Sequence, residues 1–167
     1  MKTIVALFTG FLFVLVPCRG QDSKKPDASR AAQIGAEKKP TAEELEAKFK
    51  ATLTKATLAG RWYAIKDGQI GPEKEDKYTI NSVAKLGADL WIINARIQYG
   101  KVDVVAPIPV QVKWAGDTPV IIVDKVPLPG SGTYSARVMI YEKTYAGSWS
   151  GGDHGGLLNG VITNEKN

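Results

Sequence analysis

The feature that most constrains this chain is a change of hydrophobic period near Thr57, from one apolar residue every three or four positions to one every second position. After this point, eight short runs alternate between apolar and polar residues, and turn-forming residues separate them. The predicted strands are Leu58–Ile65, Lys77–Lys85, Leu90–Tyr99, Val102–Trp114, Val120–Val126, Thr133–Glu142, Tyr145–Ser150 and Leu157–Thr163. No connection between them is long enough for a helical crossover, so neighbouring strands are expected to pair antiparallel.

A meander of eight such strands either closes into a barrel or splits into a sandwich. Closure removes the exposed edges, and eight strands enclose a space that side chains or one small ligand can fill. The sequence therefore predicts an all-β, antiparallel, up-and-down eight-stranded barrel, with a β-sandwich as the alternative. Pro107 and Pro109 cannot donate to a ladder, which predicts a bulge or an irregular edge in the fourth strand.

A helix is expected directly before the barrel. Thr41 and Glu44 have the spacing of a capping box, and Leu45, Phe49 and Leu53 recur at helical intervals. So short a helix must dock on something larger. The predicted organisation is a signal peptide at 1–20, a disordered polar linker at 21–40, the helix at 41–56 and the barrel domain at 57–167.

The N-terminus has the pattern of a secretory signal, with Lys2 before an apolar run at 4–16 that Pro17 ends. Small residues at Cys18 and Gly20 favour cleavage before Gln21, which predicts export to the periplasm or the extracellular space without stable membrane insertion. A lipid anchor on Cys18 is the alternative, although Pro17 stands where a lipobox has a small residue.

Composition excludes several classes of function. The formal charge of +5 falls to about +1 over residues 56–167, where twelve Lys and Arg face eleven acids, so no basic face for nucleic acid is expected. Cys18 and His154 are the only cysteine and the only histidine, which rules out a multi-histidine or cysteine-based metal centre. We predict neither a metal nor a cofactor.

Two resemblances bear on the fold. Gly60-Arg61-Trp62 at the start of the first strand resembles the calycins, the lipocalin and avidin group, whose barrels begin with a Gly-x-Trp. The resemblance implies a tryptophan packed across one end of the barrel, an arginine stacked on it (Arg96 or Arg137 here) and carriage of a small ligand. The stretch 145–160, with 114–119 and 132–137, also resembles small exported bacterial proteins of uncharacterised function, which implies no activity.

The candidate ligand-binding residues are three aromatic and two basic residues of the strands: Trp62, Trp91, Arg96, Arg137 and Trp149. Tryptophans around a cavity would suit an apolar molecule. Inward-facing arginines would favour an anionic headgroup, and the sequence does not decide which face is interior.

Two other segments invite a functional interpretation. Asp153-His154 has the pairing of an oriented general base, but neither Ser148 nor Ser150 lies in a nucleophile elbow. Six glycines between Gly147 and Gly160 are better explained by strand bends than by a ligand cradle. The acids at 73–76 are predicted to lie in a solvated hairpin loop.

Three hypotheses follow. The leading one is an exported, non-catalytic protein that binds a small apolar or amphipathic ligand in the barrel. The second is a structural or protein-interaction module of the cell envelope with no ligand cavity. The weakest is a hydrolase that uses His154.

Overall fold

The computed structural model describes residues 39–129 and 132–164. The predicted signal peptide with Cys18, and all of the predicted linker before Lys39, lie outside the described residues. The description below concerns the second of the two units of the chain, Lys39–Asn167.

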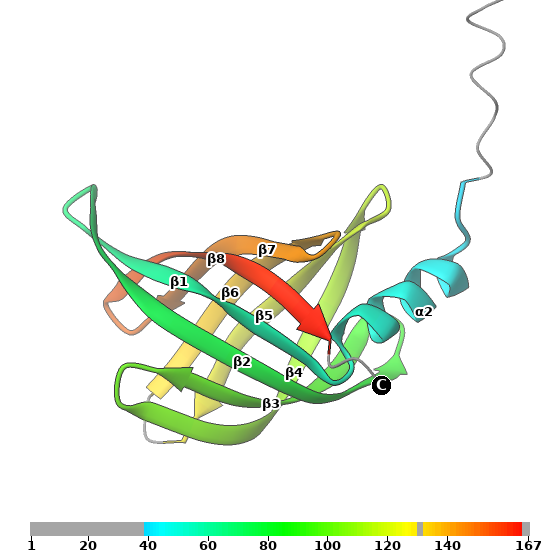
Figure 1. Cartoon of the computed structure of the whole chain (residues 1–167), viewed down its shortest axis with the longest axis horizontal. Helices are drawn as coiled ribbons and strands as arrows, with labels where there is room; N and C mark the ends of the chain where they lie inside the picture. Colours follow the sequence, from blue (N-terminus) through cyan, green and yellow to red (C-terminus); the bar gives the residue numbers. More distant parts are fainter. Residues whose placement is uncertain (1–38, 130–131, 165–167) are drawn as a thin grey trace, which may run out of the picture. The chain divides into compact units, whose positions relative to one another are not determined.

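The second unit is a closed barrel in which each strand pairs with the next and β8 pairs with β1, all antiparallel (Figure 1). This confirms the predicted eight-stranded up-and-down barrel and excludes the sandwich. The strands are β1 (Ala56–Lys66), β2 (Gln69–Gly87), β3 (Leu90–Tyr99), β4 (Val102–Ala115), β5 (Thr118–Leu128), β6 (Gly132–Tyr141), β7 (Thr144–Gly151) and β8 (His154–Asn164).

The helix α2 (Ala42–Leu53) lies at the end of the barrel where β1 begins and β8 finishes (Figure 1). The predicted capping box is present, because the Glu44 amide donates to Thr41 Oγ1 at 3.2 Å and the Thr41 amide donates to Glu44 Oε2 at 2.8 Å. The helix ends three residues earlier than expected, since Thr54 is extended and Lys55 has a φ of 54°. We call this end of the barrel the helix end and the opposite one the open end.

Strand β2 begins eight residues before the predicted start, so the acids at 73–76 lie in a strand and the loop prediction is wrong. The turn is instead the Asp67-Gly68 pair, whose φ values of 51° and 73° are those of a tight hairpin. Beyond this turn, the ladder with β1 extends from Lys66↔Gln69 to Thr57↔Thr79.

The wall of the barrel is incomplete between β4 and β5. Their ladder extends only from Gln111↔Ile122 to Ala115↔Thr118, which leaves residues 102–110 and 123–128 unpaired with each other. Pro107 and Pro109 lie in the part of β4 that pairs with β3 but not with β5, which confirms the predicted irregular edge. We call this unpaired region the side slot.

The apolar face of each strand points inward, which the sequence alone did not decide. Two glycines make room for one large inward side chain, because a Cβ atom at Gly60 or Gly160 would overlap the ring or hydroxyl of Tyr145. The Tyr145 ring therefore lies across β8 and β1 and reaches β2. This contact explains the glycine of the Gly-x-Trp motif in terms of packing.

Candidate functional site

An apolar cavity of about 140 Å³ lies inside the barrel. Every strand contributes at least one lining side chain, among them Leu58, Ile80, Ile93, Val110, Ile121, Val138, Tyr145 and Leu158. Engineered cavities of about 150 Å³ with such a lining stay dry and bind benzene. The cavity is therefore of a size and chemistry for one small apolar molecule or the end of an apolar chain.

The cavity is less well covered on the side of the side slot. Away from the slot, Ile93 and Ala95 of β3 and Leu158 of β8 are at most 7% exposed. Inward-facing Ile108 and Val123, which flank the slot and line the cavity, are only half-buried. Solvent thus reaches apolar side chains at this point of the wall.

A buried carboxyl forms a polar contact within the barrel. Asp76, 4% exposed, accepts hydrogen bonds from Tyr145 Oη at 2.9 Å and Tyr78 Oη at 3.1 Å. Burial raises the pKa of Asp76, and the two phenol donors oppose that rise. Burial likewise raises the pKa of both tyrosines well above their ordinary range. Both tyrosines line the cavity, and their hydroxyls are directed to Asp76.

Four aromatic rings surround a second hollow, of about 110 Å³, at the open end. The centroids form a closed circuit: Trp62–Tyr99 at 6.4 Å, Tyr99–Tyr134 at 6.4 Å, Tyr134–Trp149 at 6.4 Å and Trp149–Trp62 at 5.4 Å. We call Trp62, Tyr99, Tyr134 and Trp149 the aromatic box.

Several contacts hold the aromatic box together. Tyr99 Oη donates to Tyr134 Oη at 3.1 Å, and this bond raises the pKa of Tyr134 to about 12. The ring of Tyr134 lies against Gly151, where a Cβ atom would come within 2.7 Å of it. The indole nitrogens of Trp62 and Trp149 are buried without a hydrogen-bond acceptor among the described residues.

The structure brings together two of the five candidate binding residues, Trp62 and Trp149. Trp91 lies at the helix end, 3% exposed, with its ring centroid 5.2 Å from that of Phe49. Arg96 is exposed on the outer face and forms a double hydrogen bond with Asp103, at 2.7 and 2.6 Å. Arg137 is also exposed and donates to the carbonyl oxygens of Val123 and Ala136. Neither arginine lines the cavity or the aromatic box.

Sequence reasoning missed Asp76, Tyr99 and Tyr134 as site residues. A signal existed for both tyrosines, because each lies on the apolar face of its predicted strand. The signal for Asp76 was the spacing of Asp76, Tyr78 and Ile80 at every second position, which places all three on one face.

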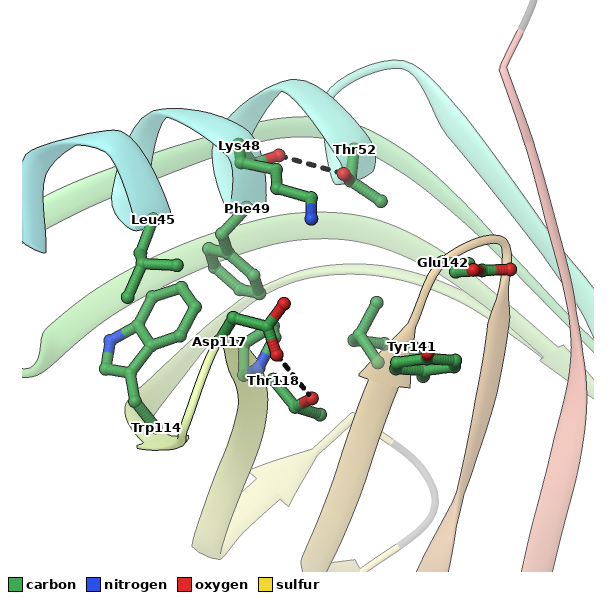
Figure 2. Close-up of a pocket in the computed structure, with 11 residues that line it drawn as sticks. Leu45, Lys48, Phe49, Thr52, Trp114, Asp117, Thr118, Tyr141 and Glu142 are labelled. Atoms are coloured by element: carbon green, nitrogen blue, oxygen red, sulfur yellow. Dashed lines mark hydrogen bonds between the residues drawn. The ribbon is translucent and has the colours of Figure 1, made fainter. Parts of the chain in front are cut away.

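A third hollow, of about 130 Å³, lies between α2 and the turns that follow β4 and β6 (Figure 2). Its apolar side is made of Leu45 and Phe49 from the helix and Trp114 from β4. Lys48, Asp117 and Glu142 are exposed polar residues around it. None of the five candidate binding residues lies in this hollow.

His154 lies at the start of β8 and belongs to no catalytic arrangement that the geometry supports. Its Nδ1 atom is 3.2 Å from Asp153 Oδ1, both residues are exposed, and this bond lowers the pKa of Asp153. Its ring packs at right angles on Trp149, with 5.4 Å between the centroids. Ser148 and Ser150 make no hydrogen bond to this imidazole within the described part of the chain.

Within residues 39–129 and 132–164, no group of three or more His, Cys, Asp or Glu side chains is placed to hold a metal ion. No helix in the same part of the chain is long and apolar enough to cross a membrane.

The chain matches no family model, no curated protein and no solved structure. Its function is therefore inferred from its own side chains, and the calycin relationship stays a prediction.

Proposed function

We propose that this protein is a non-catalytic binding protein that holds one small apolar molecule, or the apolar end of an amphipathic one, inside its barrel. The single observation that carries the proposal is the cavity of about 140 Å³, with its apolar lining drawn from all eight strands. The hydroxyls of Tyr78 and Tyr145, which line it, are already bonded to Asp76. The cavity therefore offers a ligand apolar contact in place of hydrogen bonds.

The side slot supports the proposal because apolar side chains that flank it are only half-buried. The half-buried residues Ile108, Val123 and Val138 line the cavity on this side. A bound apolar molecule would remove their exposed area from water, which stabilises the complex. Export, expected from the N-terminal sequence, belongs to the same proposal.

The experiment measures binding of benzene, and then of single-chain amphiphiles of increasing length, by NMR of the methyl groups that line the cavity. A cavity-filling variant, Ala136→Leu, is compared with Ala146→Leu, which adds the same atoms on the exposed face of β7. We expect saturable shifts in the wild type and in Ala146→Leu, and a loss of at least about tenfold in affinity in Ala136→Leu. Methyl signals that stay unchanged with every probe would exclude an apolar ligand in this cavity.

The alternative of a protein-interaction module stays a prediction. The residues that such an interface would use are exposed apolar side chains of β6 and β8, Met139, Tyr141 and Val161. Thr144 of β7 pairs with both Tyr141 and Val161, so one strand separates the apolar side chains of β6 from that of β8.

A further inference from the structure

We propose that the aromatic box at the open end is a second binding site, separate from the apolar cavity, for a small organic cation of the quaternary or methylated ammonium class. A cation is attracted to the negative face of an aromatic ring within about 6 Å of the ring centroid, and cages of several rings recognise quaternary ammonium groups. The inference rests on the arrangement of four rings and does not depend on the apolar ligand proposed above.

The first argument is geometric. Adjacent walls of a box stand at right angles, and three of the four adjacent ring pairs come close to this: 84° for Trp62–Tyr99, 82° for Trp62–Trp149 and 72° for Tyr99–Tyr134. The fourth pair, Tyr134–Trp149, is tilted at 42°. Adjacent centroids are 5.4 to 6.4 Å apart, so a cation that lies between two neighbouring rings is within the range of cation–π attraction to both.

The second argument is the lining of the hollow between the rings. The four rings and His154 are the side chains that line it, and its volume is about 110 Å³. The rings are half-buried, so a cation in the hollow would exchange part of its water shell for contact with the rings. Desolvation of this kind is the condition under which cation–π contacts are strongest.

The third argument is that one wall already attracts an ammonium group. Lys74 Nζ lies 4.7 Å from the centroid of the Trp62 ring, although Lys74 is not among the residues that line the hollow. A Trp62 face that holds a lysine at the surface is suited to hold a less strongly hydrated, methylated ammonium.

Two carboxyls near the site carry charge of the sign that attracts a cation, and Lys74 carries the opposite sign. Asp76, whose carboxyl is buried, pairs with Tyr99 in the ladder between β2 and β3. Asp153, fully exposed, lies in the turn beside His154. Neither carboxyl lines the hollow, so each would act on a bound cation through its charge and not by direct contact.

The test compares two ligands of nearly the same shape on the unmodified full-length protein. Choline carries a trimethylammonium group, and 3,3-dimethylbutan-1-ol is its neutral carbon analogue. Binding is followed by calorimetry and by NMR of the indole N–H signals of Trp62 and Trp149. We expect choline to bind about five- to thirty-fold more tightly than the neutral analogue. Equal binding of the two, or no binding of choline at millimolar concentrations, would overturn the proposal.

Variants of one wall locate the site. Tyr99→Leu removes a ring, whereas Tyr99→Phe keeps the ring and removes the hydroxyl. We expect choline binding to weaken several-fold in Tyr99→Leu and to stay within about twofold in Tyr99→Phe. The pair Tyr134→Leu and Tyr134→Phe provides the same comparison if Tyr99→Leu fails to fold.

Two controls separate this proposal from the proposed function. Ala136→Leu, which fills the apolar cavity, is expected to leave choline binding unchanged, and Tyr99→Leu is expected to leave benzene binding unchanged. If choline binds and benzene does not, the proposed function fails and the aromatic box stands as a site. If benzene binds and choline does not, the apolar cavity stands and the aromatic box fails. Loss of choline binding in Ala136→Leu would contradict the claim of two separate sites.

Discussion

The two ends of the barrel are lined by the same kinds of side chain and differ in what covers them. At the helix end, Phe49 of α2 and Trp91 meet edge to face at 5.2 Å, and they are 2% and 3% exposed. At the open end, Trp62 and Trp149 meet in the same way at 5.4 Å, but both are half-buried beside a hollow. A covering helix makes one aromatic cluster part of the core. The other cluster has no such cover among the described residues and borders the hollow that we propose as a binding site.

The largest expected effect on the free energy of unfolding comes from removing one indole at each end of the barrel. Trp91→Ala should lower the free energy of unfolding by about 3–5 kcal/mol, because it leaves a cavity beneath α2 that the packed helix cannot fill. Trp149→Ala should cost under about 2 kcal/mol, because its ring is already partly in water. Denaturant unfolding of both variants, monitored by circular dichroism, measures the difference. Equal costs would mean that the open end is as much a part of the core as the helix end.

A smaller effect distinguishes the hydrogen bonds of the interior from those of the open end. Tyr145→Phe removes one of two donors to the buried carboxyl of Asp76 and should cost about 1.5–3 kcal/mol. Tyr99→Phe removes the hydrogen bond between the Tyr99 and Tyr134 hydroxyls in the half-buried aromatic box and should cost about 1 kcal/mol or less. Both changes keep the ring, so packing is matched. Chemical denaturation gives both values, and a larger cost for Tyr99→Phe would contradict the comparison.

The barrel and its helix could be predicted from the sequence because both depend on local signals. Alternation in 90–99 and 102–114 defines two strands, and the short connections force antiparallel neighbours. The capping box depends on Thr41 and Glu44, three residues apart, so its geometry follows from the helix itself. Each of these features is determined by residues close together in the chain.

The sites could not be predicted in the same way, because they are formed by residues far apart in the chain. Trp62 meets Tyr99 and Trp149 only once the barrel closes, and sequence spacing says nothing of that contact. The two arginines were candidates because their types suit anions, but their place on the polar face of each strand directs them outward. Asp76 was assigned to a loop because charged neighbours surround it. Its burial depends on Tyr145, which reaches it across β8 and β1.

The smallest expected effect is a pH dependence of stability that arises from Asp76 in the interior and not from the open end. Burial raises the pKa of Asp76 above its ordinary value of 3.8, so the folded state holds the proton more tightly than the unfolded chain does. The contribution of this carboxyl to stability is therefore complete below pH 3.8 and is lost as the pH rises through the raised folded-state pKa. Asp76→Asn has no such group, so the stability of the wild type relative to this variant should fall with rising pH in that window.

Exposed carboxyls make stability rise with pH, which is the opposite of the effect expected for Asp76. Their contribution must therefore be removed from the comparison between the wild type and Asp76→Asn. Hydrogen bonds lower the pKa values of Asp103 and Asp153, so their contributions to stability develop as the pH rises through the lowered folded-state pKa and are complete above the ordinary value of 3.8. Both proteins keep these groups, and subtracting the two unfolding free energies at each pH cancels them. A difference that increases with pH would mean that the two phenol donors outweigh burial and that the interior stabilises the charged form of Asp76. The contrast between a dry interior and a wet open end would then be weaker than the structure indicates.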